Sequence, residues 1–120
     1  MGGTVRGIED LFCYVTTTGR RTGRPHRIEI WFAPGEASTI YVLSGGGDRA
    51  DWVRNLMADP KVTVRIRAEE GDATARVIDA ASDEDALARR LLLAKYQRPG
   101  QDDLVDWART GLPVAFDLGF

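Results

Sequence analysis

The sequence LFCYVTTTGRRTGRPHRIEIWFA, residues 11–33, contains two candidate strands separated by a basic loop. Residues 11–17 are rich in β-branched and aromatic side chains, which favours a strand. Residues 26–33 alternate charged or aromatic side chains with isoleucine and phenylalanine, the period of a strand with one buried face. Gly19 and Gly23 tolerate the backbone conformations of a tight turn. The stretch therefore predicts two neighbouring strands joined by a hairpin-like loop.

Similar patterns continue along the chain. Further strands are expected over 39–44, 61–68, 73–79 and 113–118, with a turn at 69–72. A helix capped by Asp48 or Asp51 is expected to end at Asp59, and further helices are expected from Ser82 through Tyr96 and over about 102–110. About six short strands joined by tight turns, with helices between them, predict an α+β fold that is mainly β. The sheet is expected to be mostly antiparallel and to close wholly or partly into a barrel, with helices covering an end. We expect residues 1–120 to form one domain.

Composition excludes several classes of protein. With 16 Lys+Arg against 18 Asp+Glu, the chain lacks the positive charge of most duplex nucleic-acid readers. No apolar run approaches the length of a membrane span, and the N-terminus lacks a secretory signal, so a cytoplasmic protein without a stable membrane anchor is expected. One cysteine and one histidine leave no ligand spacing for a metal site.

The basic loop is the strongest chemical signal. Residues 20–27 contain four arginines, Arg20, Arg21, Arg24 and Arg27, and no acid. Guanidinium groups bind phosphates and carboxylates through paired hydrogen bonds, and glycines let backbone N–H groups approach as well. The loop therefore predicts a site for a ligand with a phosphate and further carboxylates. A solvated hairpin tip and a nucleic-acid patch are the alternatives.

Other candidate residues have weaker signals. Ser44 and the glycines after it end a strand before a helix, where unpaired amides can bind an anion or a carbonyl, although a plain flexible loop is the alternative. Cys13 is expected to be a buried, inert thiol rather than the partner of His26, which is expected to be a surface donor. Trp31 shares the charged face of its strand and could stack on a planar ring or pack under the terminal helices.

Several motifs together resemble one known family. They are Thr16-Thr17-Thr18-Gly19-Arg20-Arg21-Thr22-Gly23-Arg24-Pro25, Ser44-Gly45-Gly46-Gly47-Asp48, and Asp51-Trp52-Val53-Arg54-Asn55-Leu56 followed by Asp59-Pro60. In these motifs the chain is similar to the deazaflavin-dependent nitroreductases, F420-dependent oxidoreductases with a split β-barrel. The resemblance covers about residues 11–118. It implies hydride transfer from reduced F420 to a small hydrophobic acceptor such as a quinone, a nitroaromatic compound or an enone.

The resemblance also implies site residues. The cofactor-binding residues expected from it and from the loop chemistry are Arg20, Arg21, Thr22, Gly23, Arg24, Arg27, Trp31, Val42, Ser44, Gly45, Gly46, Trp52 and Asn55. Tyr96, as proton donor, and Ser44 are the expected catalytic residues. Glu29 departs from the family pattern by adding a carboxylate near the expected ring site. FMN in place of F420, and a non-catalytic binding barrel, are the alternatives, and a homodimer is a further expectation.

Overall fold

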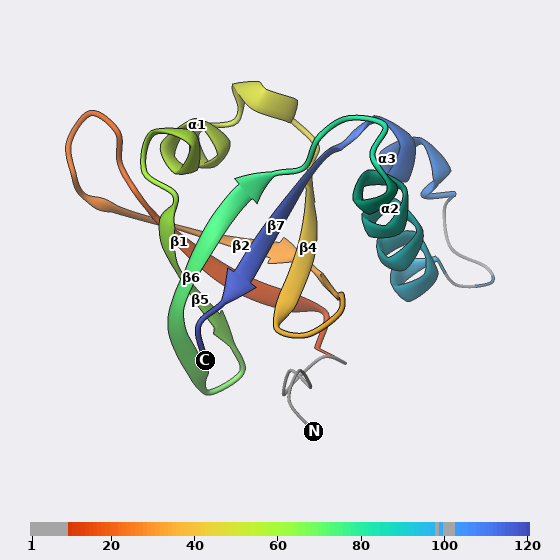
Figure 1. The fold of residues 1–120 in the computed structure, drawn as a ribbon, viewed down its shortest axis with the longest axis horizontal. Helices are drawn as coiled ribbons and strands as arrows, with labels where there is room; N and C mark the ends of the chain where they lie inside the picture. The colour runs from red at the N-terminus through yellow and green to blue at the C-terminus, as the bar shows by residue number, and fades with distance from the viewer. Residues whose placement is uncertain (1–9, 98, 100–102) are drawn as a thin grey trace.

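The strands form one antiparallel sheet that curls on itself (Figure 1). The computed structural model describes residues 10–97, 99 and 103–120. Its strands are β1 (Phe12–Thr18), β2 (Pro25–Trp31), β3 (Ala33–Pro34), β4 (Thr39–Ser44), β5 (Lys61–Ile66), β6 (Glu69–Val77) and β7 (Leu112–Leu118). Their order in the sheet is β2-β1-β5-β6-β7-β4-β3. The structure confirms the expected mainly β fold with a split, partly closed barrel.

A corner at Phe32 closes the barrel. β2 and β3 lie at opposite edges of the sheet, yet only Phe32 separates them in the chain. The single strand expected over residues 26–33 is therefore wrong, because the chain leaves one edge of the sheet and joins the other edge at this residue. Phe32 is fully buried, and its backbone N–H donates to the Tyr96 hydroxyl (2.9 Å) instead of to a neighbouring strand.

Alternating side chains fill the barrel. On β5, Val62, Val64 and Ile66 are buried, whereas the residues between them are exposed or half-buried, as their period predicts. The same core includes Cys13, Val15, Phe32, Ile40, Val42, Leu56, Val114 and Phe116. Burial of these apolar side chains is the main stabilising contribution of the barrel.

The turn expected over residues 69–72 is wrong. β6 already begins at Glu69, and the turn lies at Arg67–Ala68, with Arg67 in the left-handed region at φ 56°. Gly71 is a strand residue paired with Val64, and the Phe120 ring occupies the space that a side chain at position 71 would need. The glycine thus marks a close approach of the C-terminal segment rather than a reversal of the chain.

Three α-helices and one 3-10 turn complete the described residues. The 3-10 turn η1 (Gly47–Arg49) precedes α1 (Asp51–Ala58), so neither Asp48 nor Asp51 caps α1; its N-cap is Ala50. Ser82 caps α2 (Asp83–Tyr96) as expected, since its side chain accepts from the Asp85 N–H (3.1 Å). α3 (Val105–Thr110) is shorter than expected, and residue 102 of the expected helix lies outside the described residues.

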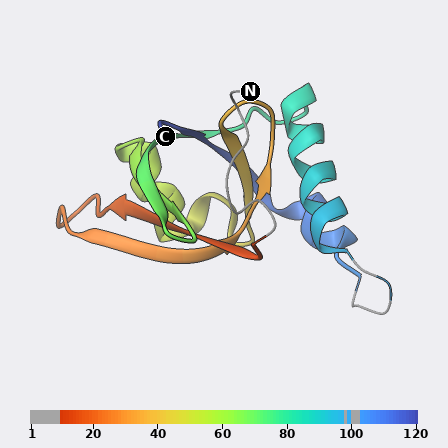
Figure 2. The ribbon, with the colours of Figure 1, turned by 90° about the horizontal axis from the view of Figure 1, so that it is seen from below.

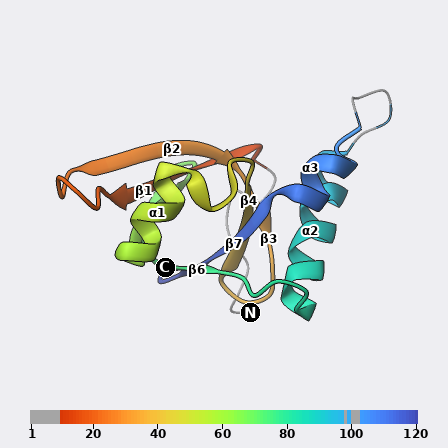
Figure 3. The ribbon, with the colours of Figure 1, turned by 90° about the horizontal axis from the view of Figure 1, so that it is seen from above.

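The helices occupy two ends of the barrel. α1 lies beside the tip of the β1–β2 hairpin, whereas α2 and α3 pack together against β4 and β7 at the opposite end (Figures 2 and 3). None of the described helices has the length and apolar character needed to cross a membrane. The basic loop is therefore next to α1 and remote from α2.

Candidate functional site

Asn55 of α1 joins the helix to the basic loop. Its side chain is only 2 % exposed, and its Nδ2 donates to Oγ1 of the buried Thr17 (3.1 Å). Its Oδ1 accepts from both the backbone N–H (3.2 Å) and Nη1 (2.9 Å) of Arg20. The two strongest sequence motifs, far apart in the chain, thus meet at one amide side chain.

Arg20 is held in one orientation. Besides Asn55, its guanidinium contacts Asp51, with Nη2 at 3.2 Å from Oδ1 and Nη1 at 3.5 Å from the backbone oxygen. The Arg20 side chain is 22 % exposed. Fixed planar donors of this kind recognise carboxylates and phosphates.

The rest of the basic loop combines a fixed backbone with free side chains. The Gly19 N–H donates to the Arg24 oxygen (2.7 Å), and Gly23, at φ 73°, donates to the Gly19 oxygen (2.8 Å). The Thr22 hydroxyl accepts from the Arg24 N–H (3.2 Å). Within the described part of the chain, the exposed guanidinium groups of Arg21 and Arg24 make no hydrogen bond or ion pair.

A small cavity opens between this loop and α1. Its volume is about 200 Å³, and it is lined by Gly19, Arg20, Arg21, Thr22, His26, Asp51 and Asn55. The side chains that face it are almost all polar, with two arginines among them. Such a donor set can hold an anionic ligand by charge-assisted hydrogen bonds.

The glycine loop leads into the same helix. Ser44 is buried, and its hydroxyl donates to the Gly47 oxygen (2.8 Å). Gly47 adopts φ 62°, which favours glycine, and Gly45 and Gly46 are exposed. In this arrangement Ser44 shapes the loop that precedes α1.

The structure does not bring all expected site residues together. Val42 is fully buried in the barrel core, and Trp52 is half-buried against that core. Trp31 stacks on Tyr96, with ring centroids 4.3 Å apart and planes 5° apart, and meets Trp107 edge-on at 5.4 Å. Trp31 therefore packs under the terminal helices, the second of its two expected roles.

The Tyr96 hydroxyl is engaged by the backbone. It accepts from the Phe32 N–H, and the oxygens of Leu11 (2.7 Å) and Phe32 (2.8 Å) lie within reach as its acceptors. Burial raises the pKa of Tyr96 to about 12. This hydroxyl lies at the α2 end of the barrel, away from the basic loop, and its expected role as proton donor stays a prediction.

Three other residues that the sequence analysis singled out, Arg27, Glu29 and Cys13, do not line the cavity. The Arg27 guanidinium sits over the Tyr14 ring, 4.2 Å from its centroid, and Glu29 accepts from the Tyr14 hydroxyl (2.8 Å). Cys13 is fully buried, and burial raises its pKa to about 12, so its thiol is the inert group expected. Cys13 is paired with Ile30 in the sheet, whereas His26 is paired with Thr17 at the start of β2 and is exposed, so the two do not form a catalytic pair.

Asp51 and Thr17 are the functional candidates that the sequence reasoning missed. Both stood in the quoted motifs, but the acid was interpreted as a helix cap and the threonine as a strand residue. Only the packing of α1 against the end of β1 shows that they contact Arg20 and Asn55.

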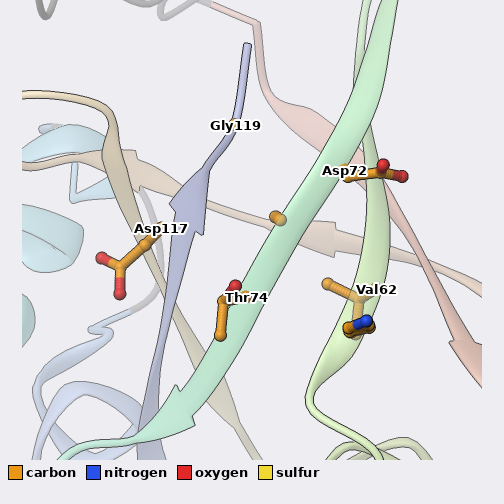
Figure 4. Close-up of a pocket in the computed structure, with 7 residues that line it drawn as sticks. Val62, Asp72, Thr74, Asp117 and Gly119 are labelled. Atoms are coloured by element: carbon orange, nitrogen blue, oxygen red, sulfur yellow. The ribbon is translucent and has the colours of Figure 1, made fainter.

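A larger hollow lies on the outside of the barrel and lacks converging polar groups. Its volume is about 310 Å³, and it is lined by Lys61, Val62, Asp72, Ala73, Thr74, Asp117 and Gly119. Figure 4 shows that the side chains of Asp72 and Asp117 point away from each other. Asp117 is also already bonded to Arg76 (2.8 Å) and Thr39 (2.7 Å). We therefore place the functional site at the basic loop.

The curled antiparallel sheet defines a split-barrel protein, and the cavity beside α1 is its candidate site for an anionic ligand. The sequence model of the F420H(2)-dependent quinone reductase family matches residues 1–118. The chain belongs to that family, whose activity is F420H2-dependent quinone reduction, and its cofactor is F420. The deazaflavin dependence expected from the motifs is thereby confirmed.

Solved structures share the fold. An F420-H2-dependent reductase, FDR-A, is similar over 94 % of this chain and 98 % of its own, with 22 % identity and a TM-score of 0.68. A structure described as a domain-swapped dimer covers 89 % and 79 %, with 23 % identity and a TM-score of 0.69. The haem storage protein HutZ from Vibrio cholerae covers 90 % and 80 %, with 17 % identity and a TM-score of 0.67.

The residues around the cavity fit this cofactor. The resemblance implies a phosphate and an acidic tail, and the loop offers two exposed guanidinium groups without partners in the described chain, a third fixed by Asn55, and the Thr22 hydroxyl. The donor chemistry therefore matches the charge of the group that the family uses.

Proposed function

We propose that the protein uses F420H2 to reduce a small hydrophobic acceptor, with the anionic part of the cofactor bound at the basic loop. A quinone is the acceptor that the family description favours; a nitroaromatic compound and an enone are the other two candidates. The observation that carries the proposal is the cavity in which Arg20 is fixed and Arg21 is available, with the exposed Arg24 in the same loop.

Each part of the site has a proposed task. Bound F420H2 supplies the hydride. Arg21, Arg24 and Thr22 bind its phosphate and acidic tail, and Gly23 gives the loop the backbone turn that presents them. Arg20 adds a donor whose direction Asn55 sets. These contacts orient the cofactor and so reduce the entropic barrier to transfer.

The ring side of the site is proposed on the other flank of α1. Ser44 and the exposed Gly45 and Gly46 shape the loop that would meet the ring or the acceptor, and Trp52 would form part of its wall. Val42 would support this wall only from within the core, where it is fully buried. Trp31 and Arg27 are less available for this role, because each already has an aromatic partner.

Titration of the protein with F420, followed by cofactor fluorescence, tests the proposal. Arg21→Ala and Arg24→Ala each remove a charge-assisted bond of about 1.5–3 kcal/mol, so each weakens binding by about ten- to a hundredfold. Arg109→Ala is the matched control, because this exposed arginine on α3 pairs with Asp106 far from the loop. Absence of F420 binding to the unaltered protein, with FMN titrated in parallel, would overturn the proposal.

A non-catalytic cofactor-binding barrel is the second candidate. It is favoured by the Tyr96 hydroxyl, which is occupied by the backbone at the α2 end instead of facing the cavity. Stopped-flow mixing of reduced F420 with a panel of quinones separates the two functions. A reductase accelerates cofactor oxidation with saturation in protein and quinone, whereas a binding barrel leaves the uncatalysed rate unchanged.

Two further expectations belong to the proposal. A homodimer is supported by one similar structure that is described as a domain-swapped dimer, and sedimentation analysis of the full chain tests it. A cytoplasmic location agrees with an unpaired, buried Cys13.

A further inference from the structure

Asp51 is an acidic side chain in an otherwise basic cavity. It is the first residue of α1, and it is the only carboxylate among the seven residues that line the cavity. Its side chain is 84 % exposed, yet its Oδ1 lies 3.2 Å from Nη2 of Arg20. The carboxylate therefore already occupies a donor that an anionic ligand would need.

The two partners of Arg20 differ in kind. Asn55 is neutral and buried, and its second bond to Thr17 fixes it in place. Asp51 is charged and exposed, and exposed ion pairs contribute little because water solvates both groups. A ligand phosphate or carboxylate can accept from two guanidinium nitrogens at once, which gives a stronger contact. Asn55 is thus a permanent partner of Arg20, and Asp51 is a replaceable one.

We propose that Asp51 competes with anionic ligands for Arg20 and thereby limits which anions the cavity accepts. A ligand with one charge exchanges one ion pair for another and is repelled by the displaced carboxylate. A ligand with several charges also engages Arg21 and Arg24, which offsets this repulsion. The identity of the natural ligand rests on the proposed function, whereas the competition itself concerns any anion.

Asp51→Asn is the informative variant, and Asp48→Asn is its matched control. Both remove one exposed acid near the start of α1, but within the described chain the Asp48 side chain makes no hydrogen bond or ion pair with Arg20. Inorganic pyrophosphate is titrated while the amide resonances of the basic loop are followed by NMR, and F420 is titrated by fluorescence. Asp51→Ser serves as a second variant should Asp51→Asn fold poorly.

The expected result is a gain in affinity specific to position 51. Asp51→Asn should bind both pyrophosphate and F420 about two- to fivefold tighter than the unaltered protein, the equivalent of an exposed ion pair, and Asp48→Asn by clearly less. Equal gains in affinity in both variants would show that the effect comes from net charge alone. Weaker binding by Asp51→Asn would show that Asp51 itself contacts the ligand. Either result overturns the inference. If pyrophosphate shows the expected pattern but F420 binds to none of the proteins, only the proposed function fails.

Discussion

At the scale of single residues, we expect Asn55 to affect both the stability of the fold and ligand binding. It satisfies Thr17, the Arg20 backbone and the Arg20 guanidinium from one buried position. Asn55→Ala leaves the buried Thr17 hydroxyl and the half-buried Arg20 N–H without this partner, each at a cost of about 1–3 kcal/mol, so we expect a loss of about 2–4 kcal/mol in the free energy of unfolding. Urea denaturation measures this loss, and F420 titration should show weaker binding because Arg20 is no longer fixed.

Thr17→Val separates the two effects. This variant keeps the shape of the side chain and the contacts between Asn55 and Arg20, but it removes the acceptor of Asn55 Nδ2. We expect a smaller loss of about 1–2 kcal/mol with F420 affinity nearly unchanged. If Asn55→Ala were no more damaging to binding than Thr17→Val, Asn55 would have a purely structural role.

At the scale of elements, the C-terminal end of α2 holds the barrel corner. Lys95 Nζ donates to the oxygens of Phe32 and Asp10, both at 2.8 Å, and lies 3.7 Å from the centroid of the Phe32 ring. Together with Tyr96, it satisfies backbone groups that lose their sheet partners where β2 ends and β3 begins.

This position makes the stability of the corner depend on pH. Burial lowers the pKa of Lys95 from 10.5 to about 8, opposed by the nearby Cys13 and Asp10. Between these values the unfolded chain binds more protons than the folded one, so the contribution of Lys95 to stability rises with pH and is lost as pH falls through about 8. We expect this change to appear when the free energies of unfolding of the unaltered protein and of Lys95→Met are measured at about pH 7 and about pH 9. Relative to Lys95→Met, the unaltered protein should be more stable at the higher pH than at the lower pH. An unchanged difference would contradict this.

The elements also show what the sequence could predict. β-Branched and aromatic content predicted the strand β1, and Ser82 predicted the start of α2, because these signals are local. The corner at Phe32 was missed because its backbone partners come from Lys95 and Tyr96, more than sixty residues away. Gly71 was interpreted as a turn because the sequence does not show that the Phe120 ring packs on it.

The candidate site also combines local features that the sequence could predict with long-range contacts that it could not. Arginine and glycine spacing predicted a tight loop that presents several guanidinium groups, because these residues are adjacent in the chain. The roles of Asp51 and Thr17 depend on how α1 packs against β1. Trp31 and Tyr96 were grouped with the cofactor by resemblance, whereas their stacking belongs to the opposite end of the barrel.

At the scale of the whole molecule, the two ends of the barrel have different tasks. The hairpin tip and α1 carry the basic cavity, whereas α2 and α3 cover the corner at the other end (Figure 3). The aromatic cluster of Trp31, Tyr96 and Trp107 belongs entirely to the second end. Because distant sites contribute nearly independently, changes at one end should leave the property of the other end intact.

Tyr96→Phe and Arg21→Ala test this division together. Tyr96→Phe removes the acceptor of the Phe32 N–H but keeps the ring stack, so we expect it to lower the free energy of unfolding by about 1–3 kcal/mol and to leave F420 affinity unchanged. Arg21→Ala should weaken F420 binding and leave the free energy of unfolding nearly unchanged, because the exposed Arg21 side chain has no partner in the described chain. The turnover rate of Tyr96→Phe with a quinone decides whether Tyr96 also has a role in the reaction. A rate close to that of the unaltered protein assigns Tyr96 to the barrel corner alone. A large fall in rate with F420 affinity intact would show that the Tyr96 proton reaches the reaction, and it would contradict the separation of the two ends.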